Sequence, residues 1–435
     1  MTHHALRSRR QCLVGLAGTA CAALAAPRVT EASEPHKRWP AIQKSLDEFV
    51  AERLAPGAAV AVSYGSRVDP VYRNAGTLAF DSRTRFDEHS ICRIASISKN
   101  VTRTAALLLV ADGKITLDQP AADVLPEFRS LRVAVDFEKG VSETRLAANV
   151  MTMRHLITNT SGLANWTPAS DGGDALHALY RERGITPGNF GVGLTRPGYG
   201  PQVKDLTEMV RRVAELPLAY EPGAVLNYSI GFDVMGLVIE RVTGKRFDAF
   251  LHERLFGPLD MRSTGFQVAA GDVARLTTNY RVLSRDSKVP PSLGVVDAAA
   301  TSDWLTRLTL LSGGGGLVST ARDFFRYGAM LLAEGALDGV RVMQPETARL
   351  IFSNLAPAGV AAPSEGVGAG TRAVLLSPMA PPGTFSAAGA TGTLFWVDRV
   401  RRGIFVFLVQ AMWADPVHHP FAPRLIAAVE ADRGP

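Results

Sequence analysis

The chain has 435 residues, of which 46% are hydrophobic and 20% are charged, a composition typical of a globular protein with a large core. Its formal net charge is +6, and Arg7, Arg9 and Arg10 contribute 3 of this with no acidic residue before Glu31, so the remainder (6 less 3) is near +3. This small net positive charge argues against a nucleic-acid partner, and the chain has no Lys/Arg run interleaved with aromatic residues.

The first 26 residues have the organisation of an export signal. Arg9-Arg10 precedes an apolar run at 12–18, and Ala23-Leu24-Ala25 supplies small residues at the spacing that a signal peptidase needs. The pattern resembles a bacterial twin-arginine signal. We therefore expect residues 1–26 to direct export to the periplasm or the medium, the alternative being a frayed N-terminal helix. The apolar run is shorter than the roughly 20 residues that cross a bilayer, so no stable membrane span is expected after cleavage.

Removal of this segment leaves one cysteine. Cys12 and Cys21 lie within it, and only Cys92 remains, so neither an intrachain disulfide nor a cysteine-based metal site is expected. A lipid anchor at Cys21 is disfavoured because Gly18-Thr19-Ala20 is a poor lead-in.

Both ends of the remaining chain predict parts of one sheet. A helix is expected at 42–53 and a strand at 58–64, while 393–398 and 403–410 are apolar runs joined by a short charged turn, as in a buried antiparallel hairpin. A helical pattern at 420–431 closes the chain. We therefore predict an α+β fold, with an antiparallel sheet flanked by terminal helices.

The middle of the chain predicts a mostly helical lobe. Helices are expected at 98–112, 152–157 and 230–243, each with a glycine soon after its last periodic residue. Gly/Pro-rich stretches at 184–200 and 356–370 are expected to be loops. The predicted organisation of the mature chain, 27–435, is a single domain. Its α/β part comes from about 40–95 and 371–435, and its helical lobe from about 96–370.

Ser96 and Lys99 stand at the entrance of the helix expected at 98–112. Because residues three apart share a helix face, their side chains should lie one above the other. A serine hydroxyl needs a proton acceptor within hydrogen-bond reach to act as a nucleophile, and Lys99 is the candidate. Free N–H groups at the helix N-terminus would face developing negative charge. Taken alone, the Ser-x-x-Lys pattern is weak and is more often a capping serine and a solvated lysine.

Ser96 lies in the first of several motifs that occur in a definite order along the chain. They lie at 86–99, 107–120, 151–163, 221–244, 313–317 and 385–398. With these motifs, from about Pro56 to about Gln410, the chain resembles the superfamily of serine β-lactamases, penicillin-binding proteins and carboxylesterases. The Tyr228 segment is similar to that of the class C branch, and the closest pattern is that of the family VIII carboxylesterases. The resemblance implies the β-lactamase/transpeptidase-like α/β fold and acyl-enzyme chemistry without a cofactor or a metal.

The resemblance also implies roles for individual residues. Ser96 would be the acylated nucleophile, Lys99 its proton partner, and Tyr228 the phenol that shares protons with both and with the leaving group. The backbone N–H groups of Ser96 and Ala390 would form the oxyanion hole, which needs two preorganised donors.

The chain departs from the family pattern where β-lactam substrates are recognised. Ala387-Ala388-Gly389 stands where Lys-Thr-Gly or His-Thr-Gly is usual, and Ile230 stands where an Asn is usual. Asn159 similarly replaces a common His. Two alanines cannot donate hydrogen bonds to a substrate carboxylate. A site that keeps its acylation groups but loses these donors suits an uncharged ester with an apolar acyl group. We therefore predict a carboxylesterase acting on small apolar esters, with 230 and 387–389 at the substrate.

Two other functions stay open. A β-lactamase or D,D-peptidase acting on β-lactam-like compounds is the alternative enzyme, and a non-enzymatic ligand-binding protein is the alternative of another class. The sequence argues against three other assignments. It has no Gly-x-Ser-x-Gly elbow of an ordinary α/β-hydrolase, and it has no second His four positions after His252, as a metalloprotease would. No Lys-Ser/Thr follows the glycines 313–316, as it would in a phosphate-binding loop.

For several residues, a purely structural role and a functional role are both considered. Trp166 and Trp396 either line an acyl pocket or simply pack, and Cys92 is expected to be a core residue. His418-His419 is expected to be solvated and not to bind a metal. Acyl-chain length, alcohol preference and oligomeric state are not specified by the sequence.

Overall fold

The computed structural model describes the chain in nine stretches. These are residues 39–65, 68–136, 140–165, 175–185, 201–282, 292–306, 308–360, 384–412 and 421–433. The expected export signal, Trp166 and His418-His419 lie outside them, as do most of the expected loops at 184–200 and 356–370.

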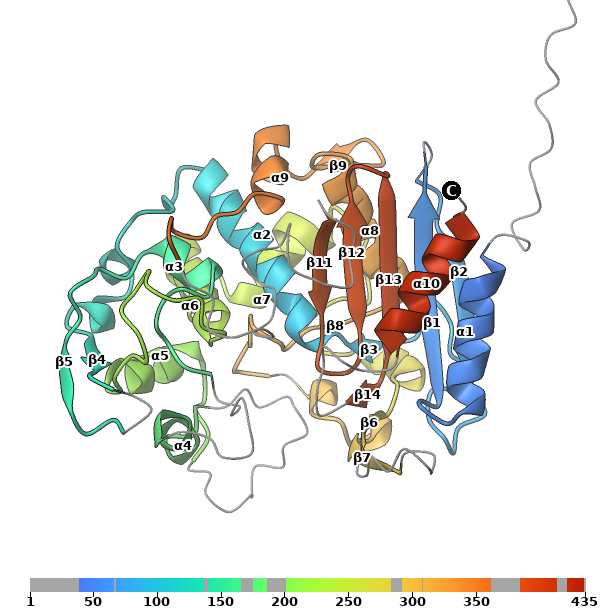
Figure 1. Cartoon of the computed structure of the whole chain (residues 1–435), viewed down its shortest axis with the longest axis horizontal. Helices are drawn as coiled ribbons and strands as arrows, with labels where there is room; N and C mark the ends of the chain where they lie inside the picture. Colours follow the sequence, from blue (N-terminus) through green and yellow to red (C-terminus); the bar gives the residue numbers. More distant parts are fainter. Residues whose placement is uncertain are drawn as a thin grey trace, which may run out of the picture. The chain divides into compact units, whose positions relative to one another are not determined.

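The centre of the fold is a five-stranded antiparallel sheet made from both ends of the chain (Figure 1). Its strands, in spatial order, are β11 (Thr384–Ala388), β12 (Leu394–Asp398), β13 (Gly403–Val409), β1 (Gly57–Tyr64) and β2 (Val71–Gly76). Val60 pairs with Phe407 across β1 and β13, and Trp396 pairs with Phe405 across β12 and β13. Every residue of β12 and β13 is buried, which explains their nearly continuous apolar sequence.

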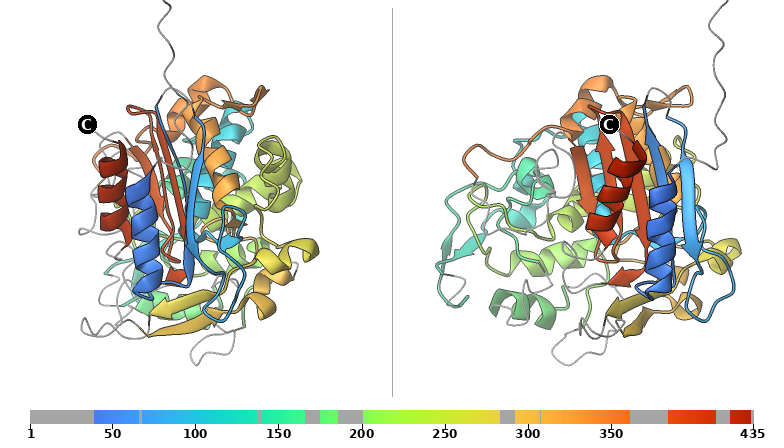
Figure 2. Two further views of the ribbon diagram at one scale, coloured as in Figure 1. Left: turned by 90° about the vertical axis from the view of Figure 1, so that its right-hand side faces the viewer. Right: turned by 45° about the vertical axis from the view of Figure 1, so that its right-hand side comes forward.

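Helices cover both faces of this sheet (Figure 2). On one face α1 (Pro40–Ala51) and α10 (Phe421–Arg433) pack side by side, and the Asp432 carboxylate of α10 accepts hydrogen bonds from the N–H groups of Ala41 and Ile42 at the start of α1. On the other face lies α8 (Ala321–Leu332). A side-chain carbon at Gly328 would lie 2.9 Å from Cγ2 of Ile404, so the glycine allows α8 to approach the sheet closely.

The middle of the chain forms the other helices. They are α2 (Ser98–Ala111), α3 (Met153–Ile157), α4 (Ala175–Glu182), α5 (Leu206–Ala214), α6 (Gly231–Thr243), α7 (Phe247–Leu251) continued by a π-helical turn η5 (His252–Phe256), and α9 (Pro345–Ile351). Gly113 and Gly244 follow α2 and α6 with φ of 66° and 67°, the left-handed conformation that ends a helix. Most of these helices lie beyond β11, the edge of the sheet that faces them (Figure 1).

Short strands and turns connect these parts. The strands are β3 (Cys92–Arg93), β4 (Arg132–Ala134), β5 (Thr144–Leu146), β6 (Asn279–Val282), β7 (Leu293–Asp297), β8 (Val318–Ser319), β9 (Ala336–Leu337), β10 (Val340–Arg341) and β14 (Ala411–Met412). The 3₁₀ turns are η2 (Ala95–Ile97), η3 (Ala121–Asp123), η4 (Pro126–Phe128), η6 (Ala270–Arg275), η7 (Ala299–Thr301) and η8 (Asp303–Leu305).

The predicted fold class is confirmed, because the sheet is antiparallel, is built from both ends of the chain and carries the terminal helices. The expected helices at 98–112 and 230–243 and the hairpin at 393–410 are present with boundaries shifted by one or two residues. Strand β2 was not predicted. Among the helices that the structure describes, none has the length and apolarity to span a bilayer.

Candidate active site

Ser96 lies at the junction of two helical segments beside the sheet edge. It is the middle residue of the turn η2, which runs directly into α2, so Ser96 and Lys99 stay one turn apart as predicted. The preceding residue, Ala95, has φ of 45°, a strained conformation for a residue with a side chain. Ser96 is half-buried and Lys99 is 7% exposed. The nucleophile is therefore held by an irregular turn and stays accessible, while the amine beside it is almost enclosed.

Tyr228 approaches Ser96 from a different part of the chain. Its phenol oxygen lies 2.6 Å from Oγ of Ser96, within hydrogen-bond distance. Nζ of Lys99 lies 4.4 Å from the centre of the Tyr228 ring and donates a hydrogen bond of 2.5 Å to the carbonyl oxygen of Gly314. The three predicted catalytic side chains thus meet in one place. In the described part of the chain, Ser96 bonds to Tyr228 and no hydrogen bond joins it to Lys99.

The turn after α3 fixes the segment that carries Tyr228. The N–H of Asn227 donates to the carbonyl of Asn159 (2.7 Å), and its side-chain amide donates to the carbonyl of Leu163 (3.0 Å). Asn159 has φ of 53° and is fully buried. Arg103 of α2 donates to the carbonyl of Ile157, the last residue of α3. The helix of Lys99 and the segment of Tyr228 are therefore tied to the same turn.

The glycine run 313–316 fits between α2 and α6 because it has no side chains. A side-chain carbon at Gly314 would lie 2.6 Å from Oδ2 of Asp233, and one at Gly313 would lie 2.5 Å from the carbonyl oxygen of Phe232. Thr102 donates a hydrogen bond of 2.8 Å to the carbonyl of Gly313. The run forms a tight turn that brings main-chain groups up to Lys99.

Asp233 is a buried carboxylate that the sequence did not single out. It lies in the first turn of α6, is 4% exposed, and accepts hydrogen bonds from Oγ of Ser312 (2.5 Å) and from the N–H of Gly314 (3.1 Å). Burial raises the pKa of its carboxyl, against the opposing effects of the Ser312 hydroxyl, the Lys99 charge and the Gly314 N–H. The only signal in the sequence was an acid five positions after Tyr228.

The end of β11 lies against the segment that precedes Ser96. A side-chain carbon at Gly389 would lie 2.6 Å from the carbonyl oxygen of Ile94, and the hydroxyl of Thr391 donates to the carbonyl of Arg93 (2.8 Å). The turn that contains Ala390 is therefore fixed to the nucleophile segment. Within the described residues, the N–H of Ala390 donates to no backbone carbonyl. That arrangement is compatible with the expected oxyanion hole.

The other predicted substrate residues differ in their surroundings. Ala387 and Ala388 are half-buried at the end of β11, whereas Ile230 is 2% exposed and belongs to the apolar core. Trp396 lies on the far face of the sheet, in the cluster with α1 and α10, stacked on Phe405 with ring centres 3.8 Å apart. Of its two interpretations, packing is therefore correct.

Nothing in the described stretches offers a metal site, since they contain no group of three or more His, Cys, Asp or Glu residues placed to hold an ion. Cys92 is buried in the core, and burial raises the pKa of its thiol to about 12, so it is not a reactive thiol at neutral pH.

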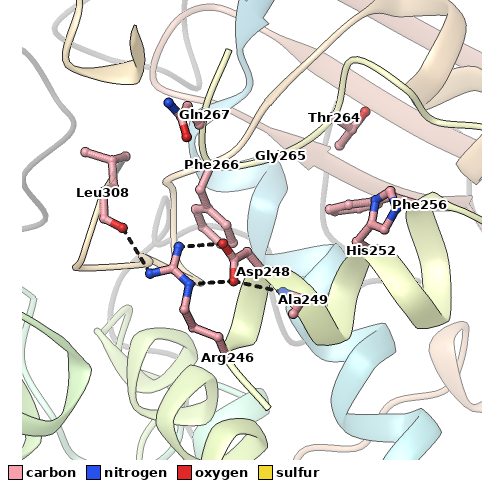
Figure 3. Close-up of a pocket in the computed structure, with 10 residues that line it drawn as sticks. All are labelled: Arg246, Asp248, Ala249, His252, Phe256, Thr264, Gly265, Phe266, Gln267 and Leu308. Carbon is pink, nitrogen blue, oxygen red and sulfur yellow. Dashed lines mark hydrogen bonds and ion pairs between the residues drawn. The ribbon is translucent and has the colours of Figure 1, made fainter. Parts of the chain in front are cut away.

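A separate hollow of about 440 Å³ opens beside α7 and η5 (Figure 3). Arg246 and Asp248 pair with each other there, and Arg246 also donates to the carbonyl of Leu308. None of Ser96, Lys99 and Tyr228 is among its lining residues, so it is distinct from the candidate active site.

Comparisons with known proteins identify the family of this chain. The model of the beta-lactamase family matches residues 42–429. The chain is 31% identical to Esterase EstB of Burkholderia gladioli over 407 residues, which are 89% of this chain and 93% of that protein. It is 30% identical to Protein Rv1367c of Mycobacterium tuberculosis, over 85% of this chain and 89% of that one. Among solved structures, "EstCE1, a hydrolase with promiscuous acyltransferase activity" has a TM-score of 0.70 at 22% identity, covering 89% of this chain and 97% of that chain.

Proposed function

The chain belongs to the beta-lactamase family, and from this we propose that it is a serine hydrolase of the carboxylesterase type that cleaves small uncharged esters through an acyl-enzyme at Ser96. The observation that carries this proposal is the 2.6 Å separation of the Ser96 and Tyr228 oxygens, with Lys99 against the same ring. The relative named Esterase EstB, aligned over nearly the whole chain, supports the ester as substrate.

The geometry supports a definite sequence of proton movements. Oγ of Ser96 attacks the carbonyl carbon of the ester while its proton passes to the phenolate oxygen of Tyr228. The carbon–oxygen bond to the alcohol then breaks, and the proton passes from Tyr228 to the departing alkoxide. A water molecule repeats these steps in reverse: it gives its proton to Tyr228, attacks the acyl carbon and releases the acid, and Ser96 recovers the proton. The nearby Lys99 ammonium stabilises negative charge on the phenol oxygen whenever the proton is absent.

The tetrahedral intermediate requires two donors for its oxyanion. We assign them to the backbone N–H groups of Ser96 and Ala390, and the contacts of Gly389 and Thr391 with the segment just before Ser96 support this assignment. Such donors typically contribute about 10²–10³ in kcat each.

The residues at the end of β11 support an apolar ester. Ala387 and Ala388 are half-buried and offer no side-chain donor to a carboxylate, so a substrate would have to be bound by apolar contact and by main-chain groups. Ile230 lies in the core, and in our proposal it adds to the apolar character behind Tyr228.

Hydrolysis of p-nitrophenyl butyrate tests the proposal. Ser96→Ala, Lys99→Ala and Tyr228→Phe should each lose activity by at least about 10²-fold. Tyr72→Phe, a half-buried phenol on β2, is the matched control and should hydrolyse the ester at the wild-type rate. Undiminished activity of Ser96→Ala would refute the mechanism. A fluorophosphonate should modify Ser96, and a protein that binds ligands without catalysis would show no adduct there.

The family match also favours a second candidate, hydrolysis of β-lactams or D-alanyl-D-alanine peptides. Nitrocefin turnover comparable to ester turnover by the same preparation, abolished in Ser96→Ala, would replace the esterase proposal with this one.

We further propose that the protein is exported. The support is the Arg9-Arg10 pair, the apolar run at 12–18 and the small residues at 23–25. In a bacterial host, the mature protein should be found in the periplasmic or extracellular fraction, and changing Arg9-Arg10 to Lys-Lys should keep it inside the cell. Equal distribution of both forms would contradict export by this route.

A further inference from the structure

A single glycine connects the carboxylate of Asp233 to the amine of Lys99. Gly314 donates its N–H to Oδ1 of Asp233 (3.1 Å) and accepts a hydrogen bond from Nζ of Lys99 on its carbonyl oxygen (2.5 Å). The second carboxylate oxygen lies against the Cα of Gly314, where a side-chain carbon would come within 2.6 Å of it. Ser312 donates to the same carboxylate (2.5 Å). The position of the Gly314 carbonyl is therefore set by the carboxylate.

In the described part of the chain, the charge of Lys99 acts on the carboxyl of Asp233, which can compensate it. On α2, Arg103 lies one turn after Lys99 and adds a second buried positive charge that pairs with no carboxylate there. Beside α2, Tyr228 and, from α8, Tyr327 contribute phenols, and α6 contributes Asp233. The glycine run contributes only main-chain dipoles.

From this geometry we propose that Asp233 is a positioning residue of the reaction: through Gly314 it orients Lys99 toward Tyr228, and its negative charge balances the ammonium. This inference rests on the proposed acyl-enzyme function. Within the described residues, Asp233 is hydrogen-bonded to Ser312 and Gly314 and to neither Ser96 nor Tyr228, so its proposed effect passes through Lys99.

The choice of an acid at this position supports a role beyond folding. A buried ionised carboxylate costs stability, and a neutral amide of the same shape could still accept the Ser312 and Gly314 hydrogen bonds. Since burial raises the pKa of Asp233, the folded protein binds its proton more readily than the unfolded chain does. Above the ordinary carboxyl pKa, the ionised Asp233 therefore lowers the unfolding free energy, and a neutral side chain at this position removes that cost. A residue retained for stability alone would not be expected to be charged here.

The test compares Asp233→Asn with Asp323→Asn on p-nitrophenyl butyrate. Asp323 is a matched control because it is also buried (2% exposed) and hydrogen-bonded, but it lies in the first turn of α8, where its N–H donates to the capping hydroxyl of Thr320 and its carboxylate accepts from the N–H of Ser263. Asp233→Asn should lower kcat about tenfold or more with KM within about twofold. It should also move the pH profile of kcat/KM to lower pH by about one unit or more, because a negative charge beside the amine is lost. Its urea midpoint should stay at or above the wild-type value.

The opposite results are equally specific. The inference is overturned if Asp233→Asn keeps the wild-type kcat and pH profile, or if kcat and the urea midpoint fall together as for a merely structural residue. In Asp323→Asn, kcat and the pH profile should match the wild type whatever happens to the urea midpoint, and a similar profile shift there would also overturn it. Gly314→Ala, which overlaps the carboxylate, should reproduce the fall in kcat.

The proposed function is tested in the same series. If the wild-type protein hydrolyses no more ester than Ser96→Ala, the proposed function fails. If the wild type is active and Asp233→Asn is indistinguishable from it, only the role of Asp233 fails.

Discussion

The buried ion pair between Arg93 and Asp297 should be the most sensitive point of the nucleophile segment to mutation. Arg93 lies three residues before Ser96, is 2% exposed, and donates to Asp297 (2.6 Å), to the carbonyl of Thr277 (2.5 Å) and to the hydroxyl of Ser302 (3.0 Å). Burial lowers the pKa of its guanidinium, and the charge of Asp297 opposes that effect. Asp297→Asn should therefore leave a buried positive charge without its counter-ion.

The expected magnitude follows from what remains after the substitution. Removing one partner of a buried pair costs about 3–5 kcal/mol, whereas exposed pairs contribute about 0–1 kcal/mol. The asparagine retains one acceptor oxygen, and the two neutral acceptors of Arg93 are unchanged. The loss in unfolding free energy should therefore lie near the lower end, about 3 kcal/mol. Activity should fall as well, because the main chain of Arg93 holds both Gln410 and the Thr391 turn near Ala390.

Urea unfolding followed by fluorescence measures this loss, with Asp303→Asn as the matched control. Asp303 lies in the neighbouring turn η8 and is exposed. Its substitution removes the same charge without breaking the pair of Arg93 with Asp297. Asp303→Asn should change the unfolding free energy by no more than about 0.5 kcal/mol. Equal urea midpoints for wild type, Asp297→Asn and Asp303→Asn would refute the reasoning that the Arg93 charge requires a buried partner.

Three further substitutions test the oxyanion turn, the pH dependence of stability and the substrate preference. Gly389→Ala should reduce kcat by about 10² or more with little change in fold, because the new carbon would lie 2.6 Å from a carbonyl oxygen that precedes the nucleophile; unchanged kinetics would remove the oxyanion assignment. Burial, aided by the Arg154 charge, lowers the pKa of His155, so the unfolding free energy should decrease as pH falls below 6.5, where the unfolded chain binds the proton first. Urea midpoints at pH 7.5 and 5.5 should show a smaller difference in His155→Gln than in wild type. The double change Ala387→Lys with Ala388→Thr should raise the ratio of nitrocefin to ester turnover, and an unaltered ratio would show that these positions do not contact substrate.

Local signals in the sequence were enough for the helices and for one half of the site. The glycines after α2 and α6 predicted where those helices end, and the three-residue spacing placed Lys99 beside Ser96. Both inferences depend only on neighbouring residues. Tyr228 lies 132 positions from Ser96, and no local rule brings the two together. Only the order of several motifs, through a family resemblance, indicated that they would meet.

The features that the sequence did not predict were missed for physical reasons. Every residue of β12 is buried, so alternation could not reveal which face carries Trp396, and the side toward α1 and α10 was not foreseen. Asp233 was overlooked because an acid in the first turn of a helix is ordinary in exposed helices. Its burial depends on the packing of the glycine run against α6, which is a tertiary contact. Strand β2 is half-buried throughout and carries polar residues, so its apolar signal is weak.

Buried charge and buried apolar surface are concentrated in different parts of the fold. Lys99, Arg103 and Asp233 lie within or beside the helices around Ser96, and Arg93 lies just before it. Each of these groups is costly to bury, and Arg103 pairs with no carboxylate in the described part of the chain. The sheet side of the molecule shows the opposite character, since the strands β1, β12 and β13 bury almost only apolar side chains against α1, α8 and α10. Stability and reactivity are therefore divided between the two parts of the fold. It follows that neutralising Asp233, whose pKa is raised by burial, should tend to stabilise the protein at the expense of activity. Neutralising one partner of the Arg93–Asp297 pair, or truncating a side chain in the sheet, should destabilise it.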